Sequence, residues 1–366
     1  MVTLVVTTGP GAMDLYSQKL AEKLDIPKIY TDIYQRIRER FNISWFSREA
    51  LKTIPEDWKF VKTLNKLRGI VHLPNQHLGR YGNFLKVPYI ITVHDLIRYF
   101  DLKGYGTCTY IQRPNFRDKA YLNLDYKGIR KAARIIATSE ATKRDLRYYL
   151  GVLDEQISVI HLGVDHAAFK PSLRPRNFEY PYILFVGSEH PRKNFPTLVK
   201  AFKRLKEQPQ FKELKLVKVG EAGGREANFR EQSSEVINSL NLDKEVLFTE
   251  VISEEDLITY YCGTECLVFP SLYEGFGLPL LEAMACGCPV IASDTSSLPE
   301  VVGEAAIKIP PQDVQGLAGA LEKVLTDRKL RESLIGRGAE QADKFSWEQT
   351  AEKTFKVYRE VEESFS

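Results

Sequence analysis

The chain of 366 residues lacks several features that would assign it at once to a common functional class. No apolar run approaches the roughly 20 residues that a membrane-spanning helix needs. The five cysteines form no C-x-x-C pair and the six histidines no H-E-x-x-H spacing, so we expect reduced thiols and no structural metal. The first residues, MVTLVVT, have no basic flank and predict a buried strand rather than a signal peptide. The expected location is therefore cytoplasmic.

Negative charge is scarce in the first half. Residues 1–165 carry a charge balance of +9 and residues 166–366 one of −6. Such an asymmetry indicates that the basic half faces an anionic partner. A phosphorylated lipid or an anionic membrane surface is one candidate, which would make the protein peripheral at the inner face of a membrane. Nucleic acid is not expected, because no nucleic-acid-binding motif accompanies the charge. The alternative is a solvated basic face without a partner.

Short apolar runs alternate with helical patterns along the whole chain. The expected strands are Leu4–Val6, Ile70–Leu73, Tyr89–Val93, Ile135–Ala137, Ile157–Ile160, Tyr182–Val186, Leu214–Val219, Val246–Phe248, Cys266–Phe269, Val290–Ile291 and Ala306–Lys308. The expected helices are Ala12–Leu24, Trp58–Leu67, Ala141–Leu150, Phe195–Glu207, Glu226–Leu240, Glu254–Tyr261, Pro279–Ala285, Val314–Leu325 and Trp347–Val361. Buried strands that alternate with helices predict the α/β class, with doubly wound parallel sheets.

Two such series imply two domains. The stretch from residue 161 to residue 181 carries three prolines and has no clear apolar period, so we place the junction there. We expect an amino-terminal domain over residues 1–165 and a carboxyl-terminal domain over residues 166–349. A final helix over about residues 350–366 is expected to pack back on the first domain.

The segment FPSLYEGFGLPLLEAMA, residues 269–285, carries the strongest functional signal. A strand ends at Phe269, a loop with Gly275 and Gly277 follows, and a helix opens near Leu278. Ligands of open parallel sheets bind at the carboxyl ends of the strands. The free N–H groups and the positive dipole end of the helix would suit a diphosphate.

Two carboxylates frame this anion site: Glu274 in the loop and Glu282 in the first helical turn. Both cannot point at phosphates, because like charges repel, so each is expected to accept hydrogen bonds from hydroxyl groups. Glu282 suits a ribose diol, and Glu274 is left for a sugar. Taken singly, Glu282 could merely complement the helix dipole, and Glu274 could be a solvated turn residue.

The same segment resembles the E-x7-E signature of the retaining glycosyltransferases of family 4, once called group 1, which have the GT-B fold. The resemblance continues through GCPVIAS at residues 287–293 and SSLPEVVG at residues 296–303. It is strong over residues 181–350 and weak before residue 90. It implies two Rossmann-like domains whose parallel sheets face each other across a cleft.

The resemblance also implies roles for residues. Glu274 would hold the donor sugar near its C3 hydroxyl and Glu282 the ribose. The backbone from Gly275 to Leu280, which includes Phe276, Gly277 and Leu278, would hold sugar hydroxyls and diphosphate.

A second loop, VGSEHPRKN at residues 186–194, follows another expected strand. Lys193 stands at the mouth of the next helix, where a lysine can neutralise the charge on a departing nucleoside diphosphate. The family usually supplies a first cation directly after Gly187, where this chain has Ser188. Arg192 is expected to take over that charge. The alternative is that both cations are surface residues beside a helix start.

Two sites in the first half are expected beside the phosphate and the acceptor. Gly9 and Gly11 form a glycine loop after the first strand, which alone is a weak signal because such turns need glycine anyway. His94 follows an apolar strand and resembles the family histidine near the reacting sugar carbon; a lone histidine is otherwise more often structural. In the second half the nucleobase is expected at the strand end that includes Val251, where Glu250 replaces the usual glycine.

These residues predict retaining transfer of a glycosyl group from a nucleoside diphosphate sugar to an acceptor hydroxyl. The loop PRKN resembles that of mannosyltransferases, so GDP-mannose is the first choice of donor, before UDP-glucose and other UDP-sugars. No D-x-D motif for Mg²⁺ occurs, so we expect neither a metal nor a cofactor. The acceptor is a glycan, a lipid-linked sugar or a small molecule, and residues 98–149 are expected to contribute to its binding. A phosphorylase or epimerase of the same fold and a non-catalytic sugar-nucleotide-binding subunit remain as alternatives.

Overall fold

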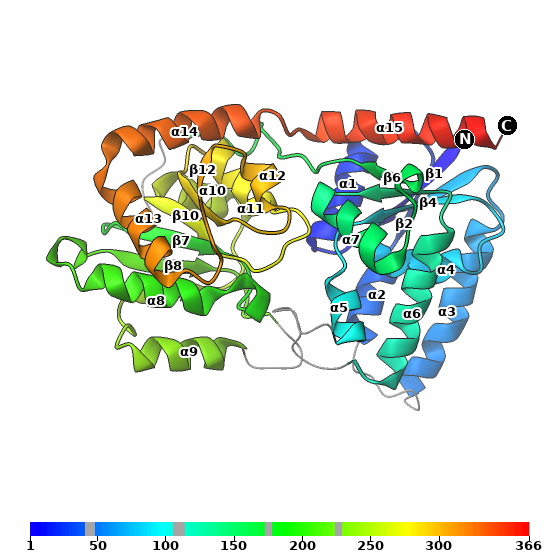
Figure 1. The fold of residues 1–366 in the computed structure, drawn as a ribbon. Coiled ribbons are helices and arrows are strands. Elements are labelled where there is room, and N and C mark those ends of the chain that lie inside the picture. The colour runs from blue at the N-terminus through cyan, green and yellow to red at the C-terminus, as the bar shows by residue number, and fades with distance from the viewer. Residues whose placement is uncertain (41–47, 105–113, 173–177, 224–228, 366) are drawn as a thin grey trace. The chain divides into compact units, whose positions relative to one another are not determined.

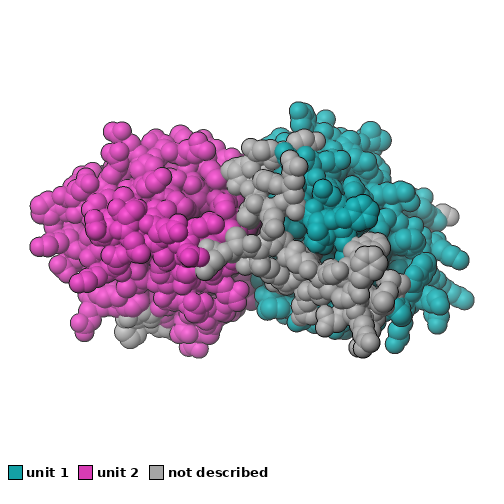
Figure 2. Space-filling view, turned by 90° about the horizontal axis from the view of Figure 1, so that it is seen from below, with its two compact units in different colours: residues 1–163, 347–366 teal, residues 164–346 magenta. Residues whose placement is uncertain are grey.

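The computed structural model describes residues 1–40, 48–104, 114–172, 178–223 and 229–365 (Figure 1). The chain folds into two compact units, shown in Figure 2. The first unit comprises residues 1–163 together with residues 347–366, and the second comprises residues 164–346. These divisions lie two and three residues from the boundaries that we expected from the sequence. Cys108 and residues 226–228 of one expected helix lie outside the described residues.

The first unit contains a six-stranded parallel sheet with the order β2-β1-β3-β4-β5-β6. Its strands are β1 (Val2–Thr7), β2 (Lys28–Thr31), β3 (Ile70–Leu73), β4 (Tyr89–Val93), β5 (Arg134–Ala137) and β6 (Ile157–Val159). Its helices are α1 (Ala12–Lys23), α2 (Ile33–Arg40), α3 (Arg48–Leu64), α4 (Gly79–Gly82), α5 (Ile97–Lys103), α6 (Phe116–Lys131), α7 (Glu140–Leu150) and α15 (Trp347–Ser364), with 3₁₀ turns η1 (Gln76–Leu78) and η2 (Asp154–Gln156). Every residue of β1, β3 and β4 is buried, as expected for strands covered on both faces.

The second unit contains another six-stranded parallel sheet, with the order β12-β11-β10-β7-β8-β9. Its strands are β7 (Tyr182–Val186), β8 (Lys215–Val219), β9 (Val246–Thr249), β10 (Cys266–Phe269), β11 (Val290–Ser293) and β12 (Ala306–Ile309). Its helices are α8 (Phe195–Lys206), α9 (Phe229–Ser239), α10 (Glu254–Gly263), α11 (Leu278–Ala285), α12 (Leu298–Val302), α13 (Val314–Thr326) and α14 (Arg328–Ala342), with 3₁₀ turns η3 (Pro191–Lys193) and η4 (Pro209–Phe211).

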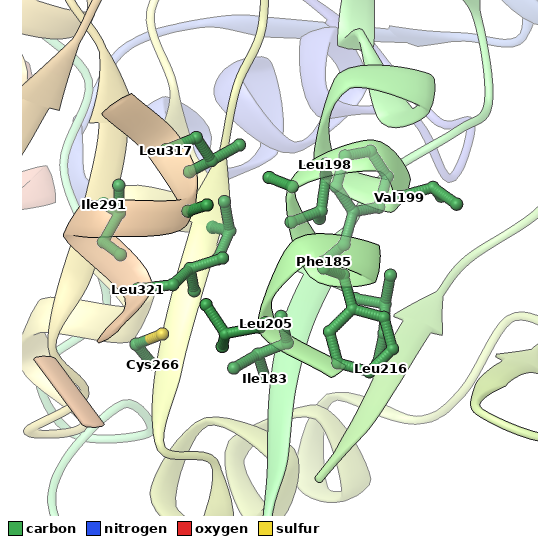
Figure 3. Close-up of a cluster of buried hydrophobic side chains, with 14 of the residues drawn as sticks. Ile183, Phe185, Leu198, Val199, Leu205, Leu216, Cys266, Ile291, Leu317 and Leu321 are labelled. Carbon is green, nitrogen blue, oxygen red and sulfur yellow. The ribbon is translucent and has the colours of Figure 1, made fainter. Parts of the chain in front are cut away.

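The core of the second unit lies between its sheet and the helices α8 and α13 (Figure 3). Ile183 and Phe185 of β7 point into this core, where Leu198 and Leu205 of α8 and Leu317 of α13 meet them. All five side chains are at most 1% exposed, so the central strand is fixed from one face. Burial of one such side chain stabilises the fold by about 1.5–3 kcal/mol.

The strand orders define where a ligand can bind. From β7 the chain winds outward through β8 and β9, and it then returns to the other side of β7 with β10. The carboxyl ends of β7 and β10 therefore flank the topological switch point of the second sheet, where the connecting loops diverge and leave a crevice. In the first sheet the chain order reverses between β1 and β3, so the carboxyl ends of these two strands flank the corresponding switch point.

Candidate active site

The two loops singled out by the sequence meet at the switch point of the second sheet. The loop after β7 contains Lys193, and the loop after β10 contains Glu274, although 81 residues separate Arg192 from its partner Tyr273. The Leu272 N–H donates to the Arg192 carbonyl at 2.7 Å, and the Arg192 guanidinium donates to the Tyr273 carbonyl at 3.2 Å. One backbone hydrogen bond and one from the Arg192 side chain therefore hold the two loops together.

Glu274 binds both cations of the neighbouring loop. Its Oε1 lies 2.7 Å from the Lys193 Nζ, and its Oε2 lies 2.7 Å from an Arg192 guanidinium nitrogen. The Ser271 hydroxyl also donates to Oε1 at 2.7 Å. Glu274 and Lys193 are buried, so these charges attract one another with little screening. Two cations against one carboxylate leave a net positive charge.

The pKa values follow from this arrangement. Burial alone would raise the pKa of Glu274, but the charges of Arg192 and Lys193 and the hydrogen bonds from Lys193 and Ser271 outweigh it and lower the pKa to about 2. Burial lowers the pKa of Lys193, and Arg192 adds to that effect while Glu274 opposes it. The short contacts and the depressed pKa of Glu274 describe an ionised cluster at neutral pH.

The glycine loop after β10 is held in place by two serines. The Glu274 N–H donates to the Ser296 hydroxyl at 3.0 Å. The Ser297 hydroxyl lies 3.0 Å from the Glu274 carbonyl and 2.7 Å from the Phe276 carbonyl, both of which can accept from it. Gly277 caps α11 with φ of +121°, a conformation that side chains rarely adopt. The helix thus begins at Leu278, as predicted, four residues after Glu274, the carboxylate of the ion cluster.

Glu282 is the fifth residue of α11, so our placement of it in the first helical turn was wrong by one residue. Its Oε2 accepts a hydrogen bond of 2.8 Å from the Tyr261 hydroxyl of α10. Burial raises the pKa of Glu282 to about 7, against the Tyr261 hydrogen bond and with help from the charge of Glu254. Its protonation therefore changes near neutral pH, unlike that of Glu274.

Gly187 and Ser188 begin the loop after β7. Gly187 has φ of +138°, and a Cβ there would lie 3.6 Å from the Lys193 Nζ, so the backbone lies close to the cation. Ser188 packs against Gly223, where an added Cβ would approach the Ser188 Cβ to 2.6 Å. Ser188, at the position where family 4 glycosyltransferases usually carry a cation, thus lies against the loop that contains Gly223.

The end of the edge strand β9 is the expected position of a base. Val251 is 69% exposed there. Glu250 lies 3.5 Å from Arg230, which also contacts the fully buried side chain of Glu189 at 2.7 Å. Lys218 of β8 lies 3.1 Å from the same Glu189 oxygen. Sequence reasoning missed this ion cluster, whose only signal was a lysine within an apolar strand.

In the first unit, Gly9 and Gly11 form the turn between β1 and α1. A Cβ on Gly9 would lie 2.6 Å from an Asp14 carboxylate oxygen, and that oxygen accepts the Gly11 N–H at 3.1 Å. The turn therefore requires a glycine at position 9 because of close approach. Gly11 is the N-cap of α1, with an extended backbone.

His94 follows β4, next to the end of β3. Its Nε2 lies 3.0 Å from the Pro74 carbonyl, which can only accept, so Nε2 carries the proton and Nδ1 is the acceptor. The His94 N–H donates to the Gln76 side chain at 3.1 Å. Burial lowers the pKa of His94 to about 4, so the ring is neutral at neutral pH. Gln76 was missed, although its position just after an apolar strand was a usable signal.

Two absences hold for the described residues alone. Within that part of the chain, every helix is too short or too polar to cross a membrane. In the same residues no three histidine, cysteine, aspartate or glutamate side chains gather as a metal site would require.

Comparisons with known proteins agree with this architecture. The family model described as glycosyl transferases group 1 matches residues 170–341, and the model described as glycosyltransferase family 4 matches residues 3–168. Sucrose-phosphate synthase from Thermosynechococcus elongatus superimposes with a TM-score of 0.75 at 24% identity and covers 98% of both chains. HepE from Anabaena, solved with UDP and glucose, gives 0.76 at 18% identity over 97% of this chain and 98% of HepE.

The curated relatives include several mannosyltransferases. O-antigen chain mannosyltransferase B of Escherichia coli is 34% identical over 178 residues, which are 49% of this chain and 45% of that protein. Serotype-specific mannosyltransferase WbdA of Escherichia coli is 30% identical over 274 residues, 72% of this chain and 32% of WbdA. The chain thus spans less than half the length of these two relatives. Since the two family models together cover nearly all of it, the chain belongs to the family 4 (group 1) glycosyltransferases and has their GT-B fold.

Proposed function

We propose that the protein transfers a mannosyl group from GDP-mannose to an acceptor hydroxyl, with retention of anomeric configuration and without a metal ion. The observation that carries this proposal is the cluster of Lys193, Arg192 and Glu274 at the switch point of the second sheet. The sheet edge presents two cations and a helix N-terminus, which together suit the diphosphate of a sugar nucleotide. The mannosyltransferases among the relatives favour mannose as the sugar.

The charges suggest how the residues share the work. Lys193 and Arg192 stabilise the negative charge that builds on the departing diphosphate, and α11 adds its N-terminal N–H groups. The departing phosphate oxygen takes the proton of the acceptor hydroxyl as that hydroxyl attacks the same face of the sugar. Glu274 orients both cations and accepts a hydrogen bond from a sugar hydroxyl. His94 is neutral, so it positions a hydroxyl group by accepting a hydrogen bond at Nδ1 and does not act as a charged acid.

The acceptor binds to the first unit. A glycan, a lipid-linked sugar or a small molecule would fit the role, in a pathway of glycan, lipopolysaccharide or glycolipid synthesis. Gly9, Gly11 and His94 lie at carboxyl ends of the strands of that unit, where an acceptor is expected. A cytoplasmic location, where sugar nucleotides are available, is part of the proposal.

A thermal-shift screen tests the donor. GDP and GDP-mannose are expected to raise the melting temperature more than UDP, ADP and their sugars, because a ligand at 100 times its Kd adds ~2.7 kcal/mol of stability. Turnover of GDP-mannose with an acceptor should persist in EDTA. A larger shift with UDP-glucose would reassign the donor. Tight binding of every nucleotide sugar without turnover would instead favour a binding subunit, and release of mannose 1-phosphate with orthophosphate a phosphorylase.

The affinity for GDP should depend on pH through Glu282. Ribose hydroxyls donate to the ionised carboxylate, whereas the pKa of about 7 leaves most of it protonated at pH 6. Binding should therefore be about tenfold weaker at pH 6 than at pH 8, because the bound state must release that proton. Calorimetry in buffers of different ionisation enthalpy measures the release. Glu282→Gln should bind GDP with little pH dependence, and a slope that survives in this variant would remove Glu282 from the ribose site.

A further inference from the structure

A hydrophobic cavity of about 160 Å³ opens on the first unit, between α3, α4 and α6. Its lining includes Trp58 and Val61 of α3, Tyr81 of α4, Phe84, and Tyr121 and Leu124 of α6. The rings of Trp58 and Phe84 lie 5.5 Å apart and are 51% and 46% exposed. Two adjacent aromatic side chains that remain half exposed beside an apolar opening form a candidate binding surface.

Two charged residues, Arg80 and Asp57, also line the cavity, and both are held by polar contacts. Arg80 binds the fully buried carboxylate of Asp125 with two bonds of 2.8 and 2.7 Å, and its guanidinium lies 4.6 Å from the centre of the Tyr121 ring. The Tyr81 hydroxyl donates to Asp57 at 2.9 Å. The charged groups of the lining are thus bound to other side chains, and the rest of the lining is apolar or aromatic.

The cavity lies away from the strand ends where we place the acceptor. Asn65, just after α3, donates to the Phe84 carbonyl at 3.1 Å and accepts the Lys86 N–H at 2.7 Å. These residues precede β3 and β4, so they lie at the amino ends of both strands. His94 and the Gly9 turn follow the opposite, carboxyl ends.

Exposed basic residues occur in the same chain segments as the two exposed rings. Lys59, Lys62 and Lys66 are exposed and lie at helical spacing beside Trp58, so they form one stripe along α3 and its end. Further exposed basic residues follow on the adjoining segments: Arg68, Lys86, Lys127, Arg130 and Lys131. The two acids nearest to Trp58 in α3 are already engaged, Glu56 with Arg36 at 2.6 Å and Asp57 with Tyr81.

We propose that this surface, made by Trp58, Phe84 and the α3 lysines, binds an anionic phospholipid bilayer. Aromatic rings beside an apolar opening suit the interface between headgroups and acyl chains, and the α3 lysines suit anionic headgroups. A protein partner would have to bury the same lysines against a matching acidic surface. The inference is independent of the proposed transferase activity, because lipid binding is measured without turnover.

Sedimentation with lipid vesicles tests it. The full chain should bind phosphatidylcholine vesicles that contain one-third phosphatidylglycerol, and should not bind pure phosphatidylcholine. The triple variant Lys59→Glu, Lys62→Glu, Lys66→Glu should bind the anionic vesicles about a hundredfold more weakly, since each basic residue near the surface contributes several-fold. Trp58→Ala with Phe84→Ala should weaken binding about tenfold. Added salt should weaken the wild type and leave little further effect on the lysine variant.

Matched variants separate this surface from general charge and hydrophobicity. Lys200→Glu, Lys212→Glu and Lys329→Glu change three exposed lysines of the second unit and should retain most of the binding. Tyr148→Ala removes an aromatic side chain that is 82% exposed elsewhere in the first unit and should have no effect. Circular dichroism confirms that each variant is folded. Wild-type binding by the lysine or aromatic variants, equal binding to neutral vesicles, or a dimer that Trp58→Ala with Phe84→Ala dissociates would each overturn the proposal.

Discussion

Lys193→Ala is expected to lower kcat by about two to three orders of magnitude while the protein stays folded. A preorganised donor aimed at developing negative charge contributes about 2–4 kcal/mol to transition-state stabilisation. Lys193 fits that description because it is buried, lies 2.7 Å from Glu274 and stands where the loops after β7 and β10 meet. After its removal, Arg192 and Ser271 still neutralise and bind Glu274, so the fold loses only part of the cluster.

Initial rates with saturating GDP-mannose measure this effect. Lys200→Ala is the matched control, because Lys200 belongs to α8 but is exposed. Lys193→Arg keeps the charge and should recover part of the lost rate. GDP binding by Lys193→Ala should weaken much less than kcat falls, since the charge that Lys193 opposes appears mainly in the transition state. A variant with the wild-type rate would show that Lys193 takes no part in the chemistry.

Much of the fold follows from the sequence because buried parallel strands are uniformly apolar. The bounds of β3, β4, β7 and β10 were predicted to the residue. By contrast, β2 was missed: its four residues are partly or fully exposed, and it forms the edge of the sheet. Helix α6 was missed because its buried face carries Asp118 and Asp125, which break the apolar period that sequence reasoning depends on.

The site shows where sequence reasoning stops. The glycine loop and the cap at Gly277 are local features, so the start of α11 could be predicted from turn and helix chemistry. The ion pairs of Glu274 depend on β7 and β10 being neighbours, although about 80 residues separate them in the chain. No local pattern shows that adjacency. Our prediction gave Glu274 to the sugar alone and did not include its ion pairs with Arg192 and Lys193.

Glu274→Gln is expected to lower the free energy of unfolding by about 3 kcal/mol at pH 7. The variant leaves two cations in the cluster without their carboxylate, and breaking a buried pair costs about 3–5 kcal/mol. The pKa of about 2, compared with an ordinary value of 4.5, leads to a similar figure of about 3 kcal/mol. Because the folded-state pKa is the lower one, this stability is present above pH 4.5 and is lost as the pH falls towards 2. Urea unfolding at pH 7 and pH 3 should therefore show a difference between wild type and variant that shrinks by more than half at pH 3.

The same variant separates the two tasks assigned to Glu274. If the carboxylate neutralises Arg192 and Lys193, its removal frees both cations for another anion, and pyrophosphate should stabilise Glu274→Gln more than the wild type. If the carboxylate also binds the sugar, kcat of Glu274→Gln should be low even though the variant binds the diphosphate of the donor tightly. A tightly held diphosphate does not by itself orient the reacting carbon of the sugar. Glu235→Gln, at an exposed position of α9, should change neither property. If Glu274→Gln had the stability and the pyrophosphate response of the wild type, the ion cluster itself would be contradicted. If it had the wild-type kcat, only the sugar contact would be contradicted.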